Sequence, residues 1–166
     1  TLLASSAASD VYKRQDVTLT MAGGGWERFA AEAAQLADKM GARFVRPGML
    51  SPADADALEN SADVLVSLGN AYDNQMPSKL FGYFATGKPV LHLAVSESDP
   101  TLPYLARYPL ALVLHAGEGV TPGVVAKLDK WLHDVKGKHL PFAEVAKLYP
   151  EFTPEKVAEA FLRGMR

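Results

Sequence analysis

Residues 63–94 read DVLVSLGNAYDNQMPSKLFGYFATGKPVLHLA, and this stretch decides the fold. An apolar run, 63–68, is followed by a polar loop with one glycine, an apolar helical segment that ends at Gly87, and a second apolar run, 89–94. Short apolar runs on either side of a helical segment are typical of two parallel strands in a buried sheet. The stretch therefore predicts an α/β fold.

The flanking sequence repeats this alternation of strand and helix. Residues 17–22 are rich in β-formers and end at three glycines, after which apolar positions recur at helical spacing as far as Met40. The pattern predicts a Rossmann-like three-layer sandwich with a parallel sheet of about five strands. The expected strands are residues 17–22, 44–45, 63–68, 89–94 and 111–115, and the expected helices are 26–40, 51–60, 77–86, 121–135, 142–149 and 153–161.

Composition limits the class of protein. A chain of 166 residues with 48% hydrophobic and 22% charged residues is typical of one soluble domain. A net charge of -2 gives no basic surface for nucleic acid. The absence of cysteine from the sequence excludes disulfides, thiolate metal sites and cysteine nucleophiles. No apolar run approaches the roughly 18 to 20 residues of a membrane span.

The first residues look foreign to the domain. Residues 5–15, SSAASDVYKRQ, resemble the in-frame translation of a sequencing-library adapter. We therefore expect residues 1–15 to be a non-native or disordered tail, with the folded domain over 16–166 and the natural sequence starting in mid-gene near Asp16. An ordinary polar tail is the alternative.

The loop and helix start after the third expected strand favour an anion site. In open parallel sheets, ligands bind beyond the carboxyl ends of the strands. The start of a helix at Pro77, Ser78 and Lys79 would present free backbone N–H groups there, which suits a pyrophosphate. A lysine in a first helical turn is unfavourable unless an anion offsets it. Simple alternatives are helix capping by Ser78 and a solvated Lys79.

The same residues carry a family resemblance. Residues 74–90, preceded by 61–66, resemble the donor-binding half of GT-B glycosyltransferases related to glycosyltransferase family 4, and the similarity extends over about 17–161. It implies the C-terminal half of a GT-B fold. It also implies transfer of a sugar from a nucleotide-diphosphate sugar to a glycan or lipid-linked acceptor, with no cofactor and no metal.

In such enzymes a separate N-terminal domain binds the acceptor, so the resemblance implies that this chain lacks that domain and its own first βα unit. The fragment alone is then expected to be inactive. Its expected setting is the cytoplasm, at the inner face of the membrane in bacterial polysaccharide assembly.

Positions match the family residue by residue. The resemblance implies that Asn74 and Gln75 face the donor sugar, and that the helix start faces the diphosphate. The implied nucleotide-sugar-binding residues are Asn74, Gln75, Pro77, Ser78, Lys79, Gly82, Gly48, Met49 and Leu50, the last three lying near the base.

The sequence departs from the family pattern in two ways. Many members have a Glu, seven residues and a second Glu, whose places are taken by Asn74 and Gly82. The second Glu usually holds the ribose hydroxyls. The family's basic pair against the diphosphate belongs to an earlier βα unit. Catalytic residues are therefore not assigned.

Other interpretations remain open at single residues. Asn74 and Gln75 are also residues that stabilise turns, and Gly82 permits close packing as well as ligand approach. His92, within an expected buried strand, is interpreted as a satisfied core histidine. Residues 54–56 match an Asp-x-Asp metal motif, but side chains two positions apart on a helix point to different sides, which disfavours a shared cation. Basic residues around Trp131 form a solvated helix face or contact anionic lipid.

Two rival functions differ in class from the transferase. A sugar-nucleotide epimerase of GT-B-like fold would bind the same donor but isomerise it. A noncatalytic flavodoxin-like or receiver-type signalling module would need an acidic cluster and an aspartate at a strand end. The strands expected here end in Gly23, Pro47 and Gly69, which disfavours the signalling module.

Overall fold

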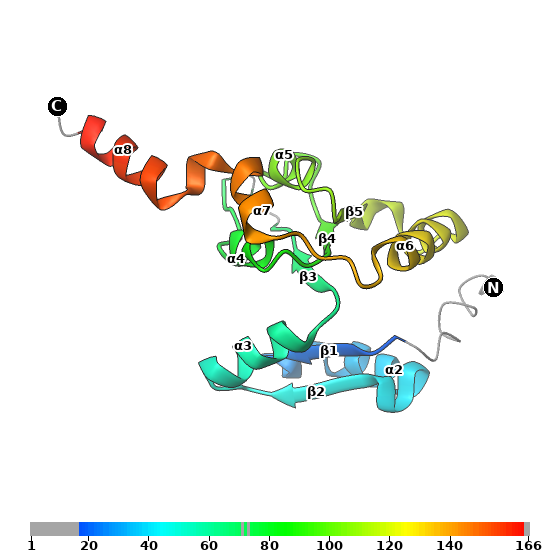
Figure 1. Ribbon diagram of the computed structural model, residues 1–166. Helices are drawn as coiled ribbons and strands as arrows, with labels where there is room; N and C mark the ends of the chain where they lie inside the picture. Colours follow the sequence, from blue (N-terminus) through cyan, green and yellow to red (C-terminus); the bar gives the residue numbers. More distant parts are fainter. Residues whose placement is uncertain (1–16, 71, 73, 165–166) are drawn as a thin grey trace. The chain divides into compact units, whose positions relative to one another are not determined.

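The computed structural model describes residues 17–70, 72 and 74–164, so the expected tail lies outside the described residues (Figure 1). The chain divides into two compact units. The first holds the chain up to Ala62 together with Val120–Asp129, and the second holds Asp63–Gly119 with the chain from Lys130 onward. Each unit is described by itself.

The first unit contains a parallel pair of strands, β1 (Leu19–Ala22) and β2 (Phe44–Gly48), in which Leu19 pairs with Phe44. Two 3-10 turns and a helix connect them: η1 (Trp26–Phe29), α2 (Ala30–Met40) and η2 (Gly41–Arg43). The helix expected over 26–40 thus begins as a 3-10 turn. It follows Gly25, whose φ of 81° lies in the left-handed region that favours glycine.

Helix α3 (Pro52–Ser61) follows β2 and starts as the sequence predicts. The Ser51 hydroxyl accepts a hydrogen bond from the Asp54 amide at 3.2 Å, and Pro52 occupies the first helical position. The Ser51 hydroxyl also donates to the Asp54 carboxylate at 2.6 Å. Asp54, part of the apparent Asp-x-Asp motif, therefore has a structural role at the start of this helix.

The second unit contains a three-stranded parallel sheet in the order β3-β4-β5. Its strands are β3 (Leu65–Leu68), β4 (Val90–Ala94) and β5 (Ala111–His115). The register is regular, with Val90 of the central strand opposite both Leu65 and Ala111. The remaining elements are α4 (Lys79–Ala85), α5 (Leu102–Leu105), η3 (Ala116–Glu118), α7 (Phe142–Leu148), η4 (Pro150–Phe152) and α8 (Pro154–Gly164), while α6 (Pro122–Val135) has residues in both units.

The core of the second unit fixes α4 in place. Leu80 and Phe84 of this helix are almost fully buried. Phe84 stacks on two tyrosines, with ring centroids 4.6 Å from Tyr108 and 5.0 Å from Tyr149. The Tyr108 hydroxyl donates to the Lys88 carbonyl at 2.9 Å, so the Tyr108 side chain is fixed both by this hydrogen bond and by stacking on Phe84. Burial raises the pKa of Tyr108 to about 12. These contacts position the chain that precedes α4.

The sequence predicts the class and most elements. All five expected strands occur and all observed pairs are parallel, so the α/β class is confirmed. The strands form one pair and one triplet, so a single sheet of about five strands stays a prediction. Helix α5 was not predicted. Within the described part of the chain, no helix is both long and apolar enough to cross a membrane.

Candidate functional site

An open pocket of about 330 Å³ lies at the carboxyl end of β3. Two segments form it: the last three residues of the strand, and the start of α4. Its lining combines apolar side chains with a few polar groups, which is the usual composition of a small-molecule site. The lining residues are Val66, Ser67, Leu68, Pro77, Ser78, Lys79 and Tyr83.

The helix start enters this pocket, but its chemistry differs from the expectation in one respect. Ser78 stands at the N-cap position with helical angles, φ -62° and ψ -29°, and its side chain makes no capping hydrogen bond. A capping side chain normally requires extended backbone angles. The interpretation of Ser78 as a hydroxyl cap is therefore wrong. Its exposed side chain instead lines the pocket.

Lys79 supplies the positive charge of the site. Among the described residues that line the pocket, it is the one that carries a formal charge. Helix α4 has seven residues, so the aligned peptide dipoles behind Lys79 are few. An anion in the pocket would thus be attracted mainly by the ammonium group, with the Ser78 hydroxyl as a hydrogen-bond donor.

Pro77, Ser78 and Lys79 line the pocket, and the remaining implied binding residues do not. Asn74 and Gln75 are exposed in the preceding loop, where the Asn70 side-chain amide donates to the Gln75 carbonyl at 3.0 Å. Gly82 is exposed on α4, and a Cβ there would meet nothing within 4 Å, so the close-packing interpretation of Gly82 is wrong.

Gly48 ends β2 in the first unit, and Met49 and Leu50 follow it. Gly48 has a φ of 77°, and the side chain of Met49 is 78% exposed. Their expected role near the base of the donor stays a prediction.

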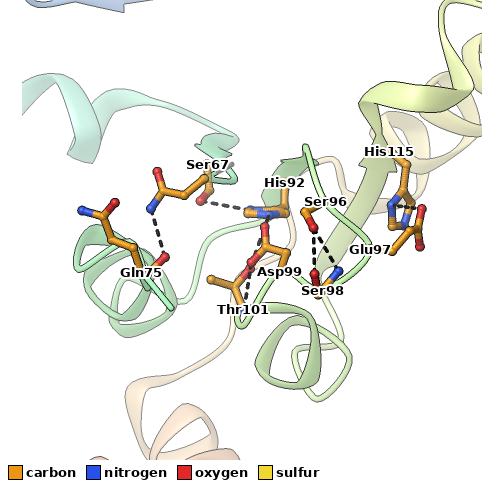
Figure 2. A network of polar contacts seen from close by, with 10 residues as sticks. Ser67, Gln75, His92, Ser96, Glu97, Ser98, Asp99, Thr101 and His115 are labelled. Carbon is orange, nitrogen blue, oxygen red and sulfur yellow. Dashed lines mark hydrogen bonds and ion pairs between the residues drawn. The ribbon is translucent and has the colours of Figure 1, made fainter. Parts of the chain in front are cut away.

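A buried polar network of four residues, Ser67, His92, Asp99 and Thr101, is shown in Figure 2, and its Ser67 also lines the pocket. The His92 ring is 0% exposed, and its two nitrogens meet Ser67 Oγ at 3.1 Å and Asp99 Oδ2 at 3.0 Å. The other carboxylate oxygen, Asp99 Oδ1, accepts from the Thr101 hydroxyl at 2.6 Å and the Thr101 amide at 2.8 Å. Every polar side chain in the network is therefore hydrogen-bonded.

Secondary structure brings the network together. Ser67 and His92 are directly opposite in the β3–β4 ladder, on strands where buried and less buried residues alternate. Asp99 and Thr101 come from the loop between β4 and α5, which folds back over the sheet edge. Gly69 makes room for this loop, because a Cβ there would collide with Asp99 Oδ2.

The protonation of the network follows from its partners. Burial by itself would raise the pKa of Asp99, but hydrogen bonds from the Thr101 side chain and backbone, and from His92, outweigh it and lower that pKa. Asp99 is then a carboxylate and can only accept. His92 Nε2 therefore carries hydrogen, and in the neutral ring Nδ1 is an acceptor for the Ser67 hydroxyl.

His92 is confirmed as a satisfied core histidine, but its partners were missed. One signal was present in the sequence: Ser67 is a polar residue at an inward-facing position of an otherwise apolar strand. Asp99 and Thr101 gave no comparable signal, since their contact depends on the unpredicted turn into α5. His115, at the end of β5, has an acidic neighbour as well, with Nδ1 3.2 Å from Glu97 Oε1.

No cluster of three or more His, Cys, Asp or Glu side chains suited to a metal ion occurs among the residues that the structure describes. Comparison with known proteins found no match: no family model fits the chain, and no curated protein or solved structure is significantly similar to it.

Proposed function

We propose that the pocket beside Lys79 binds the diphosphate end of a nucleotide-diphosphate sugar, and that the chain is the donor-binding part of a glycosyltransferase. The observation that carries this proposal is the open pocket itself, which joins Ser78 and Lys79 to the carboxyl end of β3. This edge of a parallel sheet is where α/β proteins bind ligands. A Rossmann-like single sheet, an acceptor-binding domain and a glycan or lipid-linked acceptor belong to the same proposal.

The chemistry of the lining supports an anionic ligand. An ammonium group and a hydroxyl not used for capping are donors that a phosphate oxygen accepts well, and hydrogen bonds to charged groups are stronger than neutral ones. A leaving diphosphate gains negative charge as the sugar is transferred. Donors fixed at this place would stabilise that charge as it develops.

The size of the pocket indicates which part of the donor it takes. A volume of about 330 Å³ lies at the small end of the range for ligand sites, about 300 to 1,000 Å³. It suits a diphosphate with one attached ring rather than a whole nucleotide sugar. The remainder of the donor would lie outside the pocket, beside the exposed Asn74 and Gln75.

Binding measurements test the proposal directly. UDP-glucose, GDP-mannose and inorganic pyrophosphate would be titrated into the chain by calorimetry, and the titrations repeated with Lys79→Ala. Loss of a charged hydrogen bond should weaken binding about tenfold. Lys147→Ala is the matched control, since it removes the same charge from α7 at a lysine that pairs with Glu144. Equal effects of the two variants, or no binding by the wild type, would refute the proposal.

Gly82 offers a second test. The family resemblance implies a glutamate on the ribose at this position, and the open space around Gly82 can accept a larger side chain. Gly82→Glu should therefore bind a nucleotide more tightly than Gly82→Ala, by about threefold for one additional hydrogen bond. Pyrophosphate, which has no ribose, should not distinguish the two variants. A gain for pyrophosphate alone would contradict the assignment.

A further inference from the structure

We propose that Ser67 is a specificity-determining residue of the pocket, whose oxygen accepts a hydrogen bond from a hydroxyl group of the bound ligand. The inference rests on the proposed function, because it assigns a role within the same ligand site. Ser67 is the one residue shared by the pocket lining and the buried polar network. It therefore connects the ligand site to His92 and Asp99.

The network decides what Ser67 can offer a ligand. Asp99 Oδ2 accepts a hydrogen bond from His92 Nε2, and the ring tautomer that has its hydrogen there offers a lone pair at Nδ1 to the Ser67 hydroxyl hydrogen. A serine hydroxyl has one hydrogen and two lone pairs. With that hydrogen directed at the ring, Ser67 presents lone pairs to the pocket. Lone pairs attract a ligand O–H group and repel a phosphate oxygen.

Thr101 stabilises this orientation from behind. Its hydroxyl and amide both donate to Asp99 Oδ1, which leaves Oδ2 facing His92. His92 and Thr101 are each 0% exposed, so water does not compete for these bonds. The hydrogen of Ser67 is thus directed by groups that a ligand does not touch. Lys79 would bind the anionic part of the donor, and Ser67 would accept a hydrogen bond from one of its hydroxyl groups.

The same residues also have the composition of a nucleophile–base–acid triad, and the geometry opposes that role. Ser67 lies inside a hydrogen-bonded strand, whereas the nucleophilic serine of an α/β-hydrolase stands on a sharp strand-to-helix turn. The nearby Gly69 amide, a candidate oxyanion donor, already donates to the Leu93 carbonyl at 2.9 Å. A positioning role fits these constraints better than attack on a substrate.

The experiment compares hydroxyl-bearing ligands with a bare anion. Wild type, Ser67→Ala and Ser67→Cys would be titrated with pyrophosphate, the nucleoside diphosphate and the nucleotide sugar of the series that the wild type binds. Cysteine replaces the serine hydroxyl by a thiol, whose sulfur is only a weak hydrogen-bond acceptor. Ser98→Ala is the matched control, a change at an exposed serine of the loop beside Asp99. Each variant's thermal unfolding is recorded in parallel.

We expect both Ser67 variants to bind a hydroxyl-bearing ligand about 3- to 10-fold more weakly and pyrophosphate unchanged. Unchanged pyrophosphate binding also shows that the variants are folded. Weakening already present with the nucleoside diphosphate assigns the hydroxyl to ribose, whereas weakening confined to the nucleotide sugar assigns it to the sugar.

Four results would overturn the inference. Equal weakening of pyrophosphate would mean that Ser67 donates to the anion, and unchanged affinity for all ligands would remove it from the site; both leave the proposed function standing. Failure of the wild type to bind any of the ligands would refute both. Labelling of Ser67, but not of Ser98, by a fluorophosphonate would make it a nucleophile, with fluoride leaving and the proton passing to His92.

Discussion

Replacement of Gly69 by alanine is a sharp test of how the second unit holds its buried network. The new Cβ would collide with Asp99 Oδ2 and lie 3.1 Å from the Leu93 carbonyl oxygen and 3.2 Å from the Val95 amide nitrogen. The two backbone atoms belong to β4 and the residue after it, so they cannot move aside easily. The Asp99 carboxylate must turn, and the hydrogen bond to His92 Nε2 breaks.

The cost has two parts. Overpacking against fixed backbone costs about 1 to 3 kcal/mol. Separation of His92 from its carboxylate breaks a buried hydrogen bond to a charged group and leaves Nε2 with the more distant Thr101 hydroxyl oxygen at 3.3 Å, which costs about 1 to 3 kcal/mol. Alanine regains about 0.5 to 1 kcal/mol by restricting the unfolded chain. We therefore expect Gly69→Ala to lower the free energy of unfolding by about 3 kcal/mol, within limits of about 1 to 5.5 kcal/mol.

A double-mutant cycle with Asp99→Ala isolates the collision. With the carboxylate gone, only the contacts with β4 remain, so Gly69→Ala should cost about 1 kcal/mol in that background. The expected coupling is about 1 to 2 kcal/mol, within the range for residues in contact. Urea unfolding of the four proteins, followed by circular dichroism, measures it. Costs that add to within about 0.5 kcal/mol would refute the account of Gly69.

Three further predictions concern stability. The folded-state pKa of Asp99 lies below 3.8, so its carboxylate stabilises the fold above that pH, and this contribution is lost as the pH falls through the lowered pKa. The urea midpoint should therefore decline more steeply between about pH 5 and 3 in the wild type than in Asp99→Asn. Ser51→Ala should lower the free energy of unfolding by about 1 kcal/mol by removing the cap of α3, and Ser51→Thr, which keeps a hydroxyl beside Asp54, should lose much less, as measured by urea unfolding. Arg107 donates to the Glu151 carboxylate and contacts the Tyr149 ring, with 4.7 Å between its Cζ and the ring centroid. Arg107→Ala should therefore speed amide hydrogen exchange in α7 and η4 but not in β4, and an equal increase in all three elements would contradict this.

The sequence predicts single elements of both units well where local pattern decides the structure. Residues 111–115 form a strand with the expected bounds, and Ser51 caps α3 as its spacing with Pro52 and Asp54 indicates. Apolar alternation and capping chemistry act over a few residues, so they are visible in the chain. The sheet as a whole depends on pairing between distant strands, which the pattern does not specify.

The candidate site was predicted only in part, for the same physical reason. The helix start at Ser78 and Lys79 follows from local turn and helix signals and does line a pocket. Ser67 joins that site through its register opposite His92, and Asp99 through a loop that returns to the sheet edge. These contacts arise from tertiary structure, since Ser67 and His92 are 25 positions apart in the chain and His92 and Asp99 are 7 positions apart.

The stacked rings on Phe84 make the second unit sensitive to alkali. Burial raises the pKa of Tyr149, against the lowering effect of the nearby Arg107, and burial also raises that of Tyr108. Their neutral forms therefore stabilise the fold below the ordinary tyrosine pKa of 10, and this stabilisation is lost as the pH rises above it. The phenolate absorbance of Tyr108 and Tyr149 should appear only at a pH above 10 and should coincide with release of α7 from α4. Ultraviolet absorbance of these two tyrosines therefore reports whether α7 is packed on α4.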